Sequence, residues 1–230
     1  MSRRGMMGCI GGIEPPVPVD NPVLLFYAPL IATTTPVFAW NGNLGVQQHG
    51  GGSISNSSFY MPSTGTAPIR WASAIKGGTN LTFSCWVTPS YGSGVNFMFG
   101  MLHTVTATRY AGLLLAKHVS QNYISLTTNY ISPFAASPAP PFVNSGERAF
   151  VSWTIIFDES NSYTVKFYKN GALVYTTTVV QSNWLGVIDT APGIGLGGNT
   201  CPGRYSLFSI YEEMTDEQIL KLYQEGGIAM

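Results

Sequence analysis

Acidic residues are missing from more than half of this chain. The stretch from Asn21 to Gly146 contains no Asp or Glu, and the whole sequence of 230 residues has only 11 of them beside 11 Lys and Arg. Glycosidases of the usual type need a pair of carboxylates, and calcium sites usually count several carboxylates among their ligands. The strands of the first two thirds of the chain can supply no carboxylate for either, so we expect no catalytic residues.

Charge of either sign is scarce. Only 10% of the residues are charged and the formal net charge is zero, whereas 45% are apolar and 13% aromatic. A protein without a basic surface cannot hold nucleic acid by releasing counterions from phosphates, so we expect no nucleic-acid partner. Because net charge keeps proteins apart in solution, a nearly uncharged surface favours a chain that works inside an assembly, as a homo-oligomer.

Cysteine is also rare, with Cys9, Cys85 and Cys201 at wide and irregular spacing. The spacing matches no zinc or redox motif, and an odd number cannot pair completely within one chain. We expect free thiols, with Cys85 as a small core residue, although a Cys9–Cys201 bridge stays open.

Long hydrophobic runs are absent too. No segment approaches the ~18 apolar residues of a membrane span, and Arg3 and Arg4 are not followed by the ~7–15 apolar residues of a signal peptide. We therefore expect no membrane span and no recognisable signal peptide.

The last third of the sequence carries the clearest positive signals. Two alternating segments meet at Asn170-Gly171, and an Asn-Gly pair suits the two positive φ angles of a type I′ hairpin turn. Near the end, Thr215 and Gln218 have the spacing of a capping box, flanked by Met214 and Ile219 at the positions of a hydrophobic staple. Gly226 is expected to end this helix as its C′ residue.

The order of these elements resembles one family. A strand led by Trp153, the hairpin, a Gly-rich strand from Gly193 and the capped helix follow the order of the laminin-G-like branch of the concanavalin A-like lectin/glucanase superfamily. Leu81–Pro89 resembles that family's early core strand, and Val23–Leu30 resembles its opening strand. The resemblance covers about residues 23–226 and implies an all-β jelly-roll sandwich of two antiparallel sheets, one concave. Most members bind carbohydrate or protein, and some hydrolyse glycans.

The chain divides into an arm and one domain. Residues 1–22 are rich in Gly, Met and Pro and are predicted to form an extended arm that docks on other structural proteins, with a disordered tail as the alternative. Residues 23–230 form the sandwich, with further strands expected at 96–103, 110–116 and 123–128. The Pro-rich segment 131–142 is predicted to be a long loop.

Sugar binding without catalysis asks for aromatic faces and for hydrogen-bonding side chains. Aromatic residues and one arginine in or beside predicted loops are the candidate glycan ligands: Trp40, Tyr60, Tyr91, Arg109, Tyr110, Tyr130 and Trp184. For any one of them, packing under a loop or against a neighbouring subunit is the alternative. Trp71, Trp86 and Trp153 are expected in the core. No metal or other cofactor is expected, although Asp158 and Asp189 are weak calcium candidates.

These observations predict a non-catalytic structural or surface-display protein of a larger assembly. The assembly we expect is a virion, in which the chain serves as capsid decoration, head fibre or tail component, at the virion or extracellular surface. Adhesion to cell-surface glycans is compatible with this role. The alternative is a carbohydrate-binding, lectin-like module, and a third interpretation, a glycoside hydrolase, requires carboxylates that the strands lack.

Overall fold

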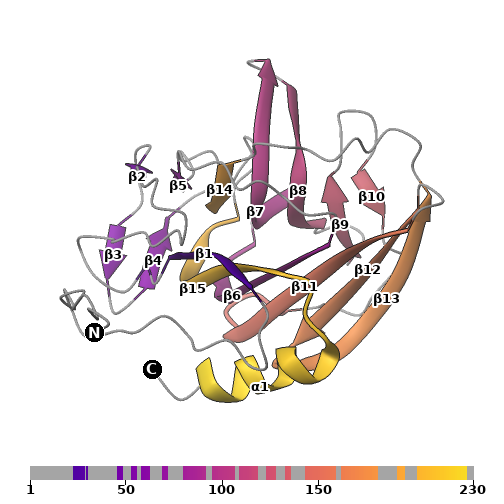
Figure 1. The fold of residues 1–230 in the computed structure, drawn as a ribbon. Helices are drawn as coiled ribbons and strands as arrows, with labels where there is room; N and C mark the ends of the chain where they lie inside the picture. Colours follow the sequence, from indigo (N-terminus) through magenta and orange to yellow (C-terminus); the bar gives the residue numbers. More distant parts are fainter. Residues whose placement is uncertain are drawn as a thin grey trace, which may run out of the picture.

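Two antiparallel sheets pack face to face in the computed structural model, and one helix lies outside them (Figure 1). The structure describes residues 23–28, 30, 46–48, 53–55, 58–62, 69–71, 80–91, 95–106, 109–118, 123–127, 133–135, 143–158, 162–180, 191–194 and 201–226. It describes side chains at 23–28, 30, 58–62, 80–91, 98–100, 143–156, 162–178, 192–194 and 201–226. The predicted all-β sandwich with one C-terminal helix is confirmed. The predicted arm, residues 1–22, lies outside the described residues.

The sheet that carries the helix, here the helix-side sheet, has eight strands. Seven of them run in the order β13-β12-β11-β6-β15-β4-β3, and β1 also pairs with β15. Their bounds are β1 (Leu24–Ala28), β3 (Ser53–Ser55), β4 (Ser58–Met61), β6 (Leu81–Pro89), β11 (Ala149–Asp158), β12 (Ser162–Lys169), β13 (Ala172–Val180) and β15 (Gly203–Glu212). The predicted early core strand is β6, with the same bounds.

The opposite sheet has seven strands in the order β10-β9-β8-β7-β14-β5-β2. They are β2 (Val46–Gln48), β5 (Ile69–Trp71), β7 (Val95–Thr106), β8 (Arg109–His118), β9 (Tyr123–Thr127), β10 (Pro133–Ala135) and β14 (Ala191–Ile194). The hairpin of β7 and β8 rises well above the rest of the sandwich (Figure 1). The segment 131–142 is not wholly a loop as predicted, because β10 pairs with β9 as a short edge strand, where proline is tolerated.

The core between the sheets follows from strict alternation along the strands. Leu81, Phe83, Cys85 and Val87 of β6 are buried on the inner side, since successive strand residues point to opposite faces. Phe83 stacks on Trp153 of β11 with ring centroids 3.9 Å apart, so the prediction that Trp153 lies in the core is confirmed. Cys85 is buried as a free thiol, as expected for a small core residue.

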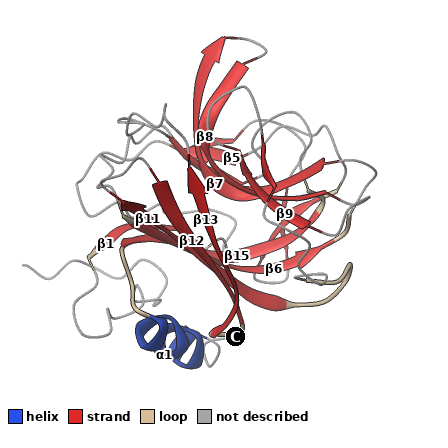
Figure 2. Ribbon diagram, turned by 90° about the vertical axis from the view of Figure 1, so that its right-hand side faces the viewer, coloured by secondary structure: helices blue, strands red, loops and turns tan. Residues whose placement is uncertain are grey.

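The helix α1 (Asp216–Gly226) covers a second apolar cluster on the outer face of the helix-side sheet (Figure 2). Ile219 and Leu222 of the helix share this cluster with Phe150, Tyr168 and Tyr211 of the strands. The helix thus covers the part of the outer face that carries this cluster. No helix in the described part of the chain is long and apolar enough to span a membrane.

The predicted capping box is present. The Gln218 amide N–H donates to Thr215 Oγ1 at 3.2 Å, and the Thr215 N–H donates to Gln218 Oε1 at 2.8 Å. Met214 and Ile219, the predicted staple, are both buried in the same cluster. Gly226 differs from the prediction, because it is the last residue of the helix rather than the residue after it.

The Asn170-Gly171 turn joins β12 and β13 with positive φ at both residues, 51° and 77°. The predicted hairpin is therefore confirmed. Asn170 adds two bonds that the turn signal does not reveal: its N–H donates to the Phe150 carbonyl at 2.8 Å, and its Oδ1 accepts the Phe150 N–H at 2.9 Å. The turn is thereby tied to the neighbouring strand β11.

Candidate functional site

Outside the cluster that α1 covers, the outer face of the helix-side sheet carries a row of polar side chains across three segments. Arg204 of β15 is the register partner of Thr88 of β6. Ala149 pairs with Val87, so the same register places Arg148 beside Thr88 on its other side. Neighbouring strands lie about 4.8 Å apart, so the two arginine Cα atoms are roughly 10 Å apart with Thr88 between them.

Arg204 is held against an aromatic ring. Its Cζ lies 5.1 Å from the centroid of the Tyr60 ring, within the ~6 Å range of cation–π attraction. One of its amino groups, Nη1, donates to Ser58 Oγ at 3.2 Å. Tyr60 is the register partner of Arg204 across β4 and β15 and remains 38% exposed. The guanidinium is therefore oriented by both a ring and a hydroxyl.

Arg148 repeats this arrangement on Trp86. Its Cζ lies 4.6 Å from the Trp86 ring centroid, and the indole is packed from below by Phe150 and Tyr223 at centroid distances of 5.5 and 5.9 Å. Trp86 was expected in the core between the sheets. It is instead half-buried on the outer face, because its position in β6 alternates with Cys85 and Val87, which point inward.

We call the set Ser58, Tyr60, Trp86, Thr88, Arg148 and Arg204 the arginine–aromatic band. The backbone that carries the band is rigid, because every member lies in a strand of the helix-side sheet except Arg148, which directly precedes one. The strand register places the two arginines on either side of Thr88, and each arginine lays its guanidinium on an aromatic ring. Such a surface presents planar arrays of N–H donors to oxygen atoms of a ligand.

The loop that positions Arg148 is fastened by its neighbours. The Gly146 N–H donates to the Pro89 carbonyl at 2.7 Å. Glu147 pairs with Lys169 at 2.6 Å and accepts two bonds from Asn144. The hydrogen bond from Lys169 is the largest cause that lowers the pKa of Glu147. A general acid needs a raised pKa, so this carboxyl holds the loop and is poorly suited to donating a proton near neutral pH.

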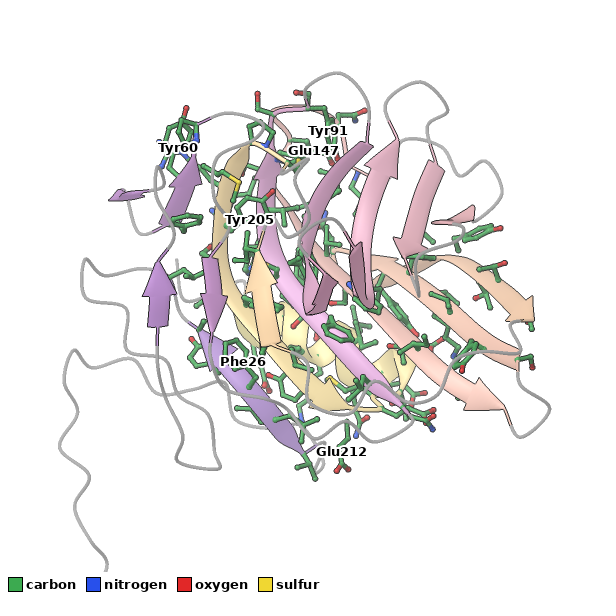
Figure 3. All side chains as sticks on the ribbon, turned by 90° about the horizontal axis from the view of Figure 1, so that it is seen from above. Phe26, Tyr60, Tyr91, Glu147, Tyr205 and Glu212 are labelled. Carbon is green, nitrogen blue, oxygen red and sulfur yellow. The ribbon has the colours of Figure 1, made fainter. Side chains whose placement is uncertain are left out.

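Tyr91 and Glu147 lie together at one end of the sandwich, the end where Tyr60 also lies, whereas Glu212 lies at the opposite end (Figure 3). The Tyr91 ring packs against the inner core and its hydroxyl donates to the Val143 carbonyl at 3.0 Å. Burial raises the pKa of Tyr91 far above its usual range. Tyr91 therefore supports the loop from inside, while Tyr60 faces outward.

The remaining predicted ligands fall elsewhere or outside the described residues. Arg109 and Tyr110 are the first residues of β8, at the tip of the β7–β8 hairpin in the opposite sheet, and their side chains are not described. Trp40, Tyr130 and Trp184 lie outside the described residues, as does Asp189. Of the seven candidates the band contains Tyr60 alone.

The described residues contain no cluster of side chains that could form a calcium site. Asp158 is the last residue of β11, and its side chain is not described. No group of three or more His, Cys, Asp or Glu side chains within the described residues could hold a metal ion. The calcium candidates remain predictions.

Arg204, Arg148 and Thr88 were missed by the sequence analysis. Arg148 has a signal that could have found it, because it stands directly before the alternating strand that leads to Trp153. Arg204 had a weaker signal, since alternation in β15 breaks at Leu207, whose φ is 52° at a bulge.

The comparisons with known proteins agree on the fold. No protein-family model matches the sequence, and no curated protein matches it either. Among solved structures, a sialidase of Trypanosoma rangeli in complex with 2,3-difluorosialic acid has a TM-score of 0.64 at 12% identity, over 89% of this chain and 33% of that one. This chain therefore spans about a third of the sialidase.

Two further neighbours are binding domains or parts of larger proteins. Domain 4 of a GH43 extracellular arabinanase from Geobacillus stearothermophilus, in complex with arabinotriose, has a TM-score of 0.59 at 15% identity, over 88% of this chain and 99% of that one. The ligand binding domain of botulinum neurotoxin serotype D, in complex with N-acetylneuraminic acid, has a TM-score of 0.60 at 15% identity, over 87% and 50%.

At these identities the neighbours establish a shared β-sandwich and nothing finer. The laminin-G-like assignment within this fold stays a prediction, and so does the absence of catalysis, since the neighbours include both glycoside hydrolases and binding domains. The virion role has no support among these neighbours and also stays a prediction.

Proposed function

We propose that this protein is a non-catalytic carbohydrate-binding module that takes its ligand on the arginine–aromatic band. The observation that carries the proposal is the pair of arginines that the register places on either side of Thr88, each with its guanidinium laid on an aromatic ring. The ligand class that fits this surface is a glycan bearing a carboxylate or another anionic group.

The two arginines are suited to ligand binding because their side chains are already oriented before a ligand arrives. An arginine stacked on a ring has already lost much of its side-chain freedom, so less entropy is lost when it binds a ligand. A guanidinium can meet a carboxylate with two parallel hydrogen bonds, which are stronger than bonds between neutral groups. Thr88 adds a hydroxyl on the strand between the two arginines, where a sugar hydroxyl can be matched.

The neighbours support a sugar ligand. Of the three described above, one is in complex with arabinotriose, one with N-acetylneuraminic acid and one with a difluorosialic acid. Two of these three ligands are acidic sugars, in keeping with a band whose charged members are both arginines.

The test is titration calorimetry of the full chain with sialyllactose and with lactose, which differ by one acidic sugar. We expect binding of sialyllactose alone. Arg204→Ala and Arg148→Ala should each weaken it about 10-fold, since a charge-assisted hydrogen bond contributes roughly 1.5–3 kcal/mol. Circular dichroism should show both variants folded.

Lys221→Ala is the matched control, because it removes an exposed cation from α1 outside the band. It should leave the affinity unchanged. Equal affinity for lactose and sialyllactose would contradict the acidic specificity. Full affinity in both arginine variants, in a chain that does bind glycan, would move the site away from the band.

A further inference from the structure

The edge strands of the two sheets differ in length. Among the described strands, three margins end in β2, β3 and β10, which have three residues each. The five-residue β1 pairs with β15, as β4 does, and is almost wholly buried. The remaining margin is β13, with nine residues, paired on one side with β12. Among the described strands, β13 alone offers a long row of backbone groups at an edge.

The sequence of β13 has neither the charges nor the proline that usually protect such a margin. Native edge strands are commonly blunted by lysine, proline, inward-pointing charges or bulges. β13 reads Ala-Leu-Val-Tyr-Thr-Thr-Thr-Val-Val, with neither charge nor proline. One irregularity exists, because Phe167 pairs with Tyr175 but Tyr168 pairs with Leu173. This bulge at Val174 leaves the six residues Tyr175–Val180 in regular register.

The composition of these six residues is suited to a strand, and the side chains described among them, Tyr175–Thr178, are exposed or half-buried. Thr176 and Thr178 are exposed on the outer face, and Tyr175 and Thr177 are half-buried on the inner side. Five of the six are β-branched, which favours pleated pairing. An uncharged, exposed and regular edge of this kind pairs readily with another strand.

We propose that β13 pairs with β13 of a second copy of this chain, antiparallel and about a two-fold axis, to form a homodimer with one continuous sheet. A neutral segment is complementary to itself, since a two-fold contact brings each side chain near its own counterpart without repulsion between like charges. The low charge of the whole sequence does not oppose the approach.

The two-fold geometry defines which side chains meet. Residues that face each other across an antiparallel pair lie on the same face of the sheet. In the two registers that pair most of Tyr175–Val180 with itself, Thr178 of one copy therefore faces Thr176 or Thr178 of the other. Lysines at both positions would place like charges against each other in either register, whereas each exposed position tolerates lysine in the single chain.

The test is sedimentation equilibrium of the full chain beside the variant Thr176→Lys/Thr178→Lys. We expect the natural chain to be a dimer. The dissociation constant of the dimer should be about 10-fold higher, or more, for the variant. The control is Thr164→Lys/Ser145→Lys, which adds the same charge. Thr164 is the register partner of Thr178 on β12, one strand inside the margin, so the control should remain a dimer.

Hydrogen exchange gives a second readout that does not depend on the substitutions. The amides of 175–180 should exchange more slowly as the protein concentration rises through the dissociation constant. A natural chain that stays monomeric, a dimer that persists unchanged in the β13 variant, or exchange at 175–180 that ignores concentration would each overturn the proposal.

Discussion

At Gly203, the first residue of β15, the backbone of β6 leaves no room for a side chain. Gly203 has a φ of +143°, and a Cβ added there would lie 2.3 Å from the Thr88 carbonyl oxygen and 2.9 Å from the Pro89 Cα. No side chain fits this space. The close approach of β15 to β6 brings Arg204, the next residue, beside Thr88.

Gly203→Ala should therefore destabilise the fold by about 3 kcal/mol, since strain at a special backbone angle adds to a backbone clash. Gly146→Ala is the comparison, because Gly146 also has a positive φ, +79°, but has nothing within 4 Å of an added Cβ. It should lose only about 1 kcal/mol. Urea denaturation of both variants measures the difference, and equal losses would show that the close approach has no energetic consequence.

For single residues, the sequence predicted those conformations that depend only on neighbouring residues. Asn170-Gly171 requires positive φ for a hairpin turn, and this requirement is visible without a structure. Gly203 and Leu207 have positive φ for a reason that only pairing of distant strands supplies. Tyr60 was found as an aromatic residue, but its partner Arg204 lies 144 positions later in the numbering, and no local pattern joins the two.

The helix shows how one element is fastened to a sheet. Asp216, its first residue, accepts hydrogen bonds through Oδ1 from Lys166 Nζ and from the Tyr168 hydroxyl, both at 2.8 Å. The bond from Lys166 is the largest cause that lowers the pKa of Asp216 below its ordinary value of 3.8. Burial raises the pKa of Tyr168, so its hydroxyl keeps its proton and donates.

The sign of the pH dependence follows. A carboxyl whose pKa is lowered on folding contributes stability above its ordinary pKa and loses it as the pH falls through the folded value. Asp216→Asn should therefore cost about 1 kcal/mol at neutral pH, and this cost should fade as the pH is lowered below 3.8.

Urea denaturation from neutral pH down to about pH 2 measures that difference. Glu217→Gln is the control, since it removes the next carboxylate of the same exposed helix turn. It should show a smaller loss. A difference between the natural chain and Asp216→Asn that does not change with pH would contradict the assignment.

Elements with local signals were predicted, and elements held by pairing alone were not. The helix was predicted by its cap, and β6 by its resemblance to the early core strand of the laminin-G-like family. β15 was missed although it is central in its sheet, because the bulge at Leu207 shifts its buried residues from Tyr205 to Phe208 and Ile210. β10 was assigned to a loop, because proline obscures a three-residue strand that forms only by pairing with β9.

Besides β13, the chain has a second predicted contact for self-association, the arm at residues 1–22. If the dimer is held through β13, a chain that begins at Asn21 should remain a dimer in light scattering after size exclusion. The full chain is the reference. Loss of the dimer on removal of the arm, with Thr176→Lys/Thr178→Lys without effect, would assign self-association to the arm instead.

The place of the band on the outer face has a consequence for valency. A two-fold axis between antiparallel β13 strands runs perpendicular to the joined sheet, so both copies of the band face the same side. Three strand spacings separate β13 from β6, so the bands lie several tens of ångströms apart. One short glycan cannot reach both, but a surface that displays many glycans can. Weak affinity at each band would then become firm adhesion through the raised effective concentration of the second site.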